Sequence, residues 1–181
     1  MTTLSSAGWV VHDIGLATTI GGSLFGQLAL EPSLDQVSRA AERDRVSEKA
    51  WNRFSWLKLA GHVAFAVPWF VGRKMLSGNE VSARARALTL TKDGLVIASL
   101  VTGVSSFVIG QILGRKVRRG QGPEQAKARR EAHESTALER AVSVLGALNT
   151  IASTGVLAVT SLLAMEGSES LRFSVRSRDL P

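Results

Sequence analysis

The residues of this chain that could do chemistry are polar and ionisable side chains that interrupt long apolar segments. Because a charged group at membrane depth is costly, such residues indicate a functional site by default. If the apolar segments are helices that alternate in direction, these residues form two groups, one near each end of the bundle. The first group, expected at the outer side, is His12, Asp13, Lys92, Asp93 and Glu166, and the second, in the inner half, is Gln27, Lys58, His62, Gln111 and Asn149.

Each group has two interpretations. The inner group predicts a polar pocket or a proton path, and His62 is the first residue we would assign to it. The outer group predicts the same chemistry nearer the membrane surface. The alternative for both is structural, namely ion pairs at the interface and interhelical hydrogen bonds worth about 0.6–2 kcal/mol each.

His62 and His12 are also the candidate cofactor-binding residues, with haem or quinone as the cofactor. His12 lies near the start of one predicted span and His62 about two turns into the returning span. At 1.5 Å per residue, the two lie roughly 15 Å apart along the membrane normal. We therefore do not expect both to ligate one haem; ligation by one histidine, or a haem shared with another subunit, stays open. The sequence does not identify a cofactor.

Other catalytic chemistries have little support. The chain has no cysteine, which excludes disulfides, thiolate metal sites and dithiol redox chemistry. No Ser lies in a Gly-x-Ser-x-Gly turn, and there is no phosphate-binding loop. A zinc site would need a cluster of ligands that the sequence lacks. The sequence therefore favours a protein that is not an enzyme and has no metal site.

Four apolar segments position these residues: 9–30, 54–72, 88–114 and 141–165. A helix needs about 20 apolar residues to cross a hydrocarbon core about 30 Å thick. We predict an all-α, four-helix transmembrane bundle with charged cytoplasmic helical loops, forming a single integral membrane domain over 1–181. Glu31-Pro32-Ser33 is expected to end or kink the first span, and Ser33 with Gln36 to cap the next helix. The charged stretch 34–53 is expected to lie as a helix on or near the membrane surface.

Small residues recur along the first and third spans. In lipid, helices associate where small residues let their backbones approach closely. The stripe of the first span is expected to pack near that of the third. The predicted packing glycines are Gly15, Gly22, Gly26, Gly103, Gly110 and Gly114. All four tryptophans fall near predicted span ends, which is typical of an aromatic belt at the headgroups.

Charge predicts the orientation and the nearest partner. The net charge is +7, and 14 of the 22 basic residues lie in 34–58 and 115–140. Basic loops stay in the cytoplasm, so we expect both termini outside and multi-pass insertion in the plasma membrane. The basic residues flank apolar segments, which favours a bilayer with anionic headgroups as partner over nucleic acid.

One resemblance adds to this interpretation. The run His12-Asp13-Ile14-Gly15, followed by Gly21-Gly22-Ser23-Leu24-Phe25-Gly26, resembles the opening of uncharacterised bacterial four-span membrane proteins. The later layout is similar too, with a charged first loop containing tryptophans and Gly-Arg-Lys after the third span. The resemblance implies a four-helix bacterial membrane protein and supplies no activity or catalytic residue.

Three functions stay open. We favour a structural or accessory subunit of a membrane complex, associated with other membrane subunits or with copies of itself. The second is a transporter or channel component, which would work as a homo-oligomer because four short spans leave little room for an enclosed path. The third is a membrane redox protein with haem or quinone near His62.

Overall fold

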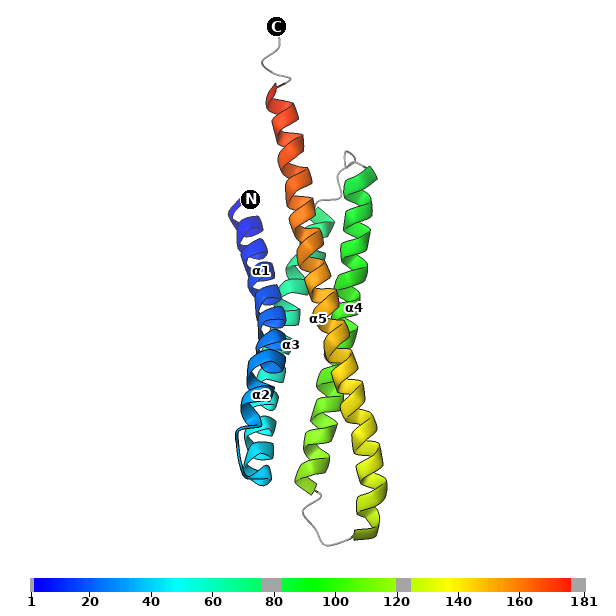
Figure 1. The fold of residues 1–181 in the computed structure, drawn as a ribbon. Coiled ribbons are helices and arrows are strands. Elements are labelled where there is room, and N and C mark those ends of the chain that lie inside the picture. The colour runs from blue at the N-terminus through cyan, green and yellow to red at the C-terminus, as the bar shows by residue number, and fades with distance from the viewer. Residues whose placement is uncertain (1, 76–82, 120–124, 177–181) are drawn as a thin grey trace.

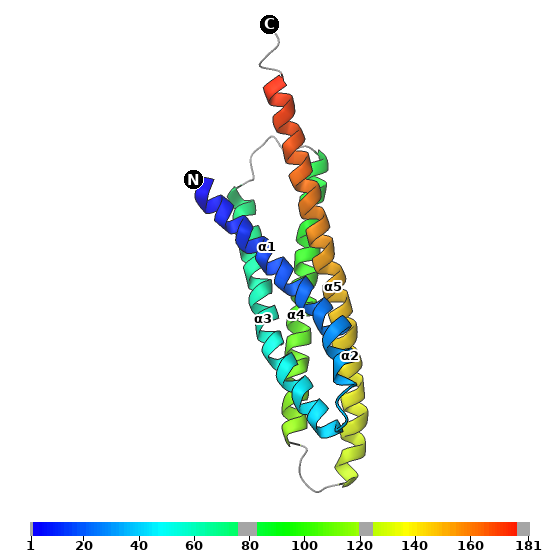
Figure 2. The same cartoon turned by 60° about the vertical axis from the view of Figure 1, so that its left-hand side comes forward.

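The four long helices of the protein run up and down in one bundle. The computed structural model describes residues 2–75, 83–119 and 125–176, and the side chains of 6–72 (except 40, 41 and 44), 83–112, 137, 138 and 140–166. The long helices are α1 (Thr2–Phe25), α3 (Ala40–Met75), α4 (Ala83–Arg119) and α5 (Gln125–Arg176). The start of α1 and the end of α5 lie at the same end of the bundle (Figures 1 and 2). The predicted all-α bundle is confirmed.

Three helical segments are long and apolar enough to cross a membrane: Arg45–Gly72, Ala83–Ile112 and Arg140–Glu166. They coincide with the second, third and fourth predicted spans to within about two and a half turns at each end. Among the described residues α1 does not reach the same level of hydropathy, because His12, Asp13 and several small residues interrupt its apolar run. That α1 crosses the membrane therefore stays a prediction.

The first helix does not stop at Pro32. A π-helical turn, Gly26–Leu30, follows α1 and continues into the short α2 (Glu31–Leu34), with the Glu31 amide donating to the Gly26 carbonyl. Since proline has no N–H to donate, the wider turn just before it adjusts the backbone hydrogen-bond register without ending the helix. The hydroxyl of Ser33 donates to the Ala29 carbonyl at 2.6 Å and does not cap a new helix, so the predicted cap is wrong.

The charged stretch that follows is not a separate surface helix either. Residues 40–53 are the first turns of α3, which runs on without a break through Pro68 to Met75. The sequence offers no reason to stop, since neither Gly nor Pro occurs between Ala40 and Gly61. The helix α3 therefore carries both a charged end and an apolar span.

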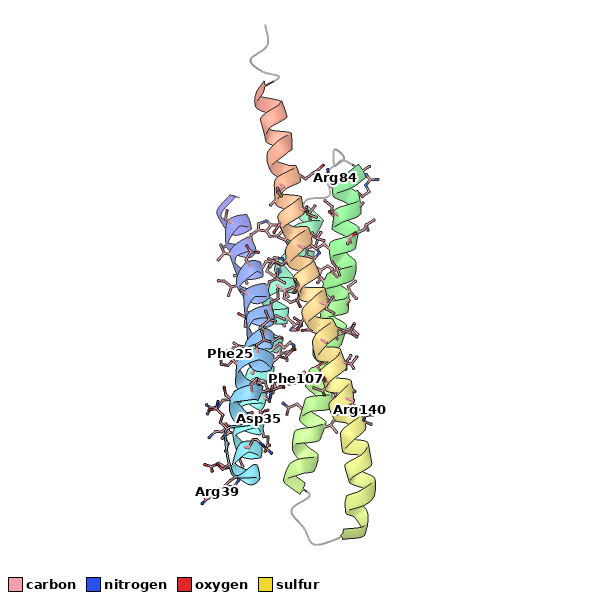
Figure 3. All side chains as sticks on the ribbon, viewed as in Figure 1. Phe25, Asp35, Arg39, Arg84, Phe107 and Arg140 are labelled. Atoms are coloured by element: carbon pink, nitrogen blue, oxygen red, sulfur yellow. The ribbon has the colours of Figure 1, made fainter. Side chains whose placement is uncertain are left out.

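The bundle buries polar side chains and exposes apolar ones. Its apolar core is small, and the buried residues include as many polar as apolar side chains. Large apolar side chains such as Val101 and Phe25 are over half exposed, and Phe25 is labelled in Figure 3. A buried polar interior under an apolar surface is expected where lipid surrounds the helices. The apolar core is Leu16, Phe65, Ala66, Trp69, Val96 and Val156.

The stripe of small residues in α1 faces α3. A Cβ at Gly15 would lie 2.6 Å from the Gly61 carbonyl oxygen and 2.6 Å from the Phe65 nitrogen, so the two backbones touch there. Further along, the rings of Phe54 and Trp51 fill the space beside Gly22 and Gly26. The approach of α1 to α3 thus sets which residues of the two helices are level with each other.

The stripe of α4 does not face that of α1, contrary to expectation. The helix α4 packs against α5 and α3, and at Gly103 the space is occupied by the imidazole of His62. Among the described residues, no atom outside the adjoining backbone of α4 lies within 4 Å of the Cβ position at Gly110, and Gly114 lies outside the described side chains. The small residue at Gly103 therefore makes room for a side chain and not for the backbone of another helix.

Two tryptophans depart from the expected aromatic belt. Trp69 is only 4% exposed and belongs to the core, and Trp9 packs edge-on against it at 6.1 Å between ring centroids. Trp56, by contrast, is 58% exposed and suits the membrane interface. The sequence positions of Trp9 and Trp69 near span ends did not reveal that they face each other.

Candidate functional site

The inner cluster is a hydrogen-bonded network that joins α3, α4 and α5. The Nδ1–H of His62 donates to the Lys58 carbonyl at 2.7 Å, and its Nε2 accepts from the Asn149 amide at 2.9 Å. The same amide nitrogen donates to the Ser99 carbonyl at 2.7 Å, and the hydroxyls of Ser99 and Ser153 are 2.8 Å apart. All four side chains of this inner cluster, His62, Ser99, Asn149 and Ser153, are at most 1% exposed.

This network fixes the tautomer of His62. Because a carbonyl can only accept, Nδ1 carries the proton, and Nε2 is the acceptor for the Asn149 amide. Both ring nitrogens are therefore engaged, and neither is available to iron or to a proton donor without breaking a hydrogen bond. The arrangement holds three helices together.

Only part of the predicted inner group meets. His62 and Asn149 do, whereas Lys58 contributes its carbonyl and Gln27 is exposed. Gln111 donates to Asn52 at 3.0 Å, away from the inner cluster. The predicted group did not include Ser99 and Ser153, because serine is also a common small packing residue of membrane helices.

The outer cluster lies closer to the end of the bundle that carries the start of α1. His12 from α1, Trp69 from α3, and Lys92 and Asp93 from α4 are all less than 9% exposed. The Nδ1 of His12 donates to the Phe65 carbonyl at 2.5 Å, and the indole of Trp69 donates to the Asp93 carboxylate at 2.9 Å. Three helices thus converge on one buried group.

The ammonium of Lys92 is enclosed by aromatic faces. Its Nζ is 3.9 Å from the centroid of the Trp69 ring and 5.0 Å from that of Trp9. A cation over an indole face gains about 2 kcal/mol or more when it is desolvated. The imidazole of His12 contacts both indoles, with centroids 5.4 Å from Trp9 and 6.4 Å from Trp69.

The other two predicted members of the outer group lie apart from this core. Asp13 is exposed, although it acts electrostatically on Lys92. Glu166 forms an ion pair with Arg84 at 3.5 Å, at the same end of the bundle (Figure 3). We define the outer cluster as Trp9, His12, Trp69, Lys92 and Asp93.

The two clusters differ in how well their polar atoms are satisfied. Within the described part of the chain, the Nε2 of His12 and the Nζ of Lys92 are buried without a hydrogen-bond partner. In the inner cluster the only such atom is the side-chain oxygen of Asn149. Since an unsatisfied buried group costs about 1–3 kcal/mol, the outer cluster is the better candidate for a binding site.

The two histidines are closer than expected. Their ring centroids lie 6.1 Å (His12) and 5.4 Å (His62) from that of Phe65, which is incompatible with a separation of 15 Å. The reason is helix register, because the contact of Gly15 with Gly61 brings His12 level with Phe65. Each histidine nevertheless has its own hydrogen-bond partners.

The described residues contain no group of three His, Cys, Asp or Glu side chains that could hold a metal ion. Comparisons with protein-family models, curated proteins and solved structures found no match. The resemblance to bacterial four-span proteins therefore stays a prediction, and the functional argument rests on the geometry of the two clusters.

Proposed function

We propose that this protein is a small multi-pass subunit of a bacterial plasma-membrane complex, with a structural or accessory role. The observation that carries the proposal is the inner cluster. Its polar side chains bond to one another across α3, α4 and α5. Polar groups used in this way hold a bundle in one arrangement.

The outer surface supports a role in assembly. The faces of α4 and α5 that point away from the bundle carry exposed large apolar side chains, for example Val101, Val108 and Ile151. Lipid or another membrane helix can cover such faces. In this proposal the chain is inserted with its basic loops in the cytoplasm and both termini outside.

Co-purification from native membranes tests the proposal. The tagged chain is extracted in mild detergent and the intact complex is weighed by native mass spectrometry. We expect a stoichiometric complex with other membrane proteins. A chain recovered only as a monomer, or only with itself, would contradict the accessory role.

A transport component working as a homo-oligomer is the second candidate, and the outer cluster favours it. Lys92 and Asp93 are buried ionisable residues near the end of a predicted span, where such groups often belong to ion or proton pathways. Proton flux into liposomes containing the purified chain tests it. Flux that disappears in Lys92→Met, while Lys49→Met retains it, would support transport; absence of flux from the native chain would exclude it.

A further inference from the structure

The buried atoms without partners in the outer cluster are complementary to each other. Lys92 Nζ is a donor, and His12 Nε2 is an acceptor because Nδ1 carries the ring proton. Both residues are 0% exposed, and they are in contact with the same two indole rings. A group that accepts from the ammonium and donates to the imidazole would satisfy both.

The charges around these two atoms restrict the kind of group that can bind between them. An anion would face the lone pair of His12 Nε2 and the nearby carboxylates of Asp93 and Asp13. A metal cation would be repelled by the ammonium of Lys92. A neutral hydroxyl meets both requirements, since its oxygen accepts one hydrogen bond and its proton is donated in another.

We propose that the outer cluster is a binding site for one hydroxyl group, held between Lys92 Nζ and His12 Nε2. The hydroxyl can come from a water molecule or from a lipid-soluble phenol such as a quinol, which present the same O–H group to these two atoms. The indoles of Trp9 and Trp69 exclude bulk solvent and stabilise the ammonium. The site is separate from the inner cluster, and it goes beyond the proposed accessory function.

Nitrogen-15 NMR of histidine-labelled protein in lipid nanodiscs tests this site directly. The chain has three histidines, so His12→Gln and His133→Gln assign the signals. His62 Nε2, which accepts from the Asn149 amide, is an internal reference for a hydrogen-bonded acceptor. We expect His12 Nε2 to be unprotonated and to show the same hydrogen-bonded shift.

The same NMR measurement on the Lys92→Met variant is the second part of the test. Without the ammonium the hydroxyl loses one of its two partners, so the His12 Nε2 signal should move toward the shift of an unbonded nitrogen. The His62 signals should stay unchanged, which shows that the bundle is still folded. If His62 shifts as well, Lys92→Leu, which also lacks the ammonium, takes its place; an unchanged His12 signal in a folded variant overturns the role of Lys92.

The source of the hydroxyl is identified in the same samples. A cross-peak between His12 and water protons in nanodiscs without quinol assigns the site to water. A hydrogen-bonded shift that appears only after addition of a decyl benzoquinol assigns it to the phenol. If His12 Nε2 is unbonded in both samples, or protonated, the proposal is wrong whatever the outcome of co-purification.

Discussion

At the scale of single residues, the two histidines exchange the roles that their sequence positions suggest. His62, which lies deeper in an apolar segment, uses both ring nitrogens to connect three helices. His12, near the start of its helix, keeps one buried nitrogen without a partner. Depth in a span is therefore a weaker indicator of a binding residue here than the balance of donors and acceptors around it.

Asn149 is the residue on which the inner cluster depends. Replacing it by leucine keeps the branched shape of the side chain but removes the donor to His62 Nε2 and to the Ser99 carbonyl. We expect Asn149→Leu to lower the free energy of unfolding by about 1–2 kcal/mol. Reversible unfolding in mixed micelles measures the change, with the exposed Thr154→Val in the same helix as control. Equal stabilities of the two variants would contradict a holding role for the cluster.

Gly103 and Gly110 form a matched pair in α4. A methyl group at Gly103 would collide with the His62 ring, whereas the space at Gly110 is open. We expect Gly103→Ala to destabilise the protein by about 1–3 kcal/mol, as overpacked cores do. Gly110→Ala should be neutral or stabilising by up to about 1 kcal/mol, since alanine favours helix. The thermal unfolding midpoints of the two variants test this prediction. A larger drop in the midpoint for Gly110→Ala than for Gly103→Ala would refute the packing of His62 against Gly103.

At the scale of elements, the pairing of α1 with α3 determines what the remaining helices can reach. Gly15 and Gly61 bring the two backbones into contact, and this contact places His12 beside the Phe65 carbonyl. The Gly-x-x-x-Gly spacing correctly indicated a packing face on α1. It carried no information on the partner helix, because any helix with small or flat side chains can fill such a groove.

A cross-link tests this register. The Cβ position at Gly8 is 3.8 Å from the Pro68 Cβ, a separation typical of disulfides, and the chain has no other cysteine. We expect Gly8→Cys with Pro68→Cys to form an intramolecular disulfide on mild oxidation. Gly21→Cys with Pro68→Cys is the control and should stay reduced. Adding Gly15→Ala should lower the yield of the first pair, because α1 must move away from α3; an undiminished yield would contradict the close contact.

At the scale of the whole molecule, the course of the chain brings the two most basic segments to the same end of the bundle. The connection from α2 to α3 and the adjoining ends of α4 and α5 lie at the opposite end of the bundle from the start of α1 (Figures 1 and 2). That end carries the two segments richest in Lys and Arg. The proposed orientation places this end in the cytoplasm, as the bias of basic residues predicts.

Single cysteines report this orientation in intact cells. We expect Ser6→Cys and Ala83→Cys to react with a membrane-impermeant thiol reagent added outside, since both would face away from the cytoplasm. Ser38→Cys, near the basic end, should react only after the membrane is permeabilised. Labelling of Ser38→Cys in intact cells, with Ser6→Cys protected, would mean the reverse orientation.

The sequence by itself determined the helical class and three segments capable of crossing a membrane, because hydropathy and charge are read along the chain. It also identified half of the inner cluster and three of the five members of the outer cluster, since a polar or ionisable residue in an apolar run is conspicuous. It did not reveal that α3 is uninterrupted, because the charge of residues 34–53 was the reason to expect a separate surface helix there. Helix continuity depends on backbone breakers, and this stretch has none.

Only the tertiary structure decided which polar groups meet. Ser99 and Ser153 join the inner cluster, while Gln27 and Gln111 stay outside it, because helix rotation and register are set by contacts between distant residues. The same contacts turn Trp9 and Trp69 inward around Lys92. A one-dimensional pattern places a residue on a face of its helix, but the close approach at Gly15 and Gly61 determines what that face meets.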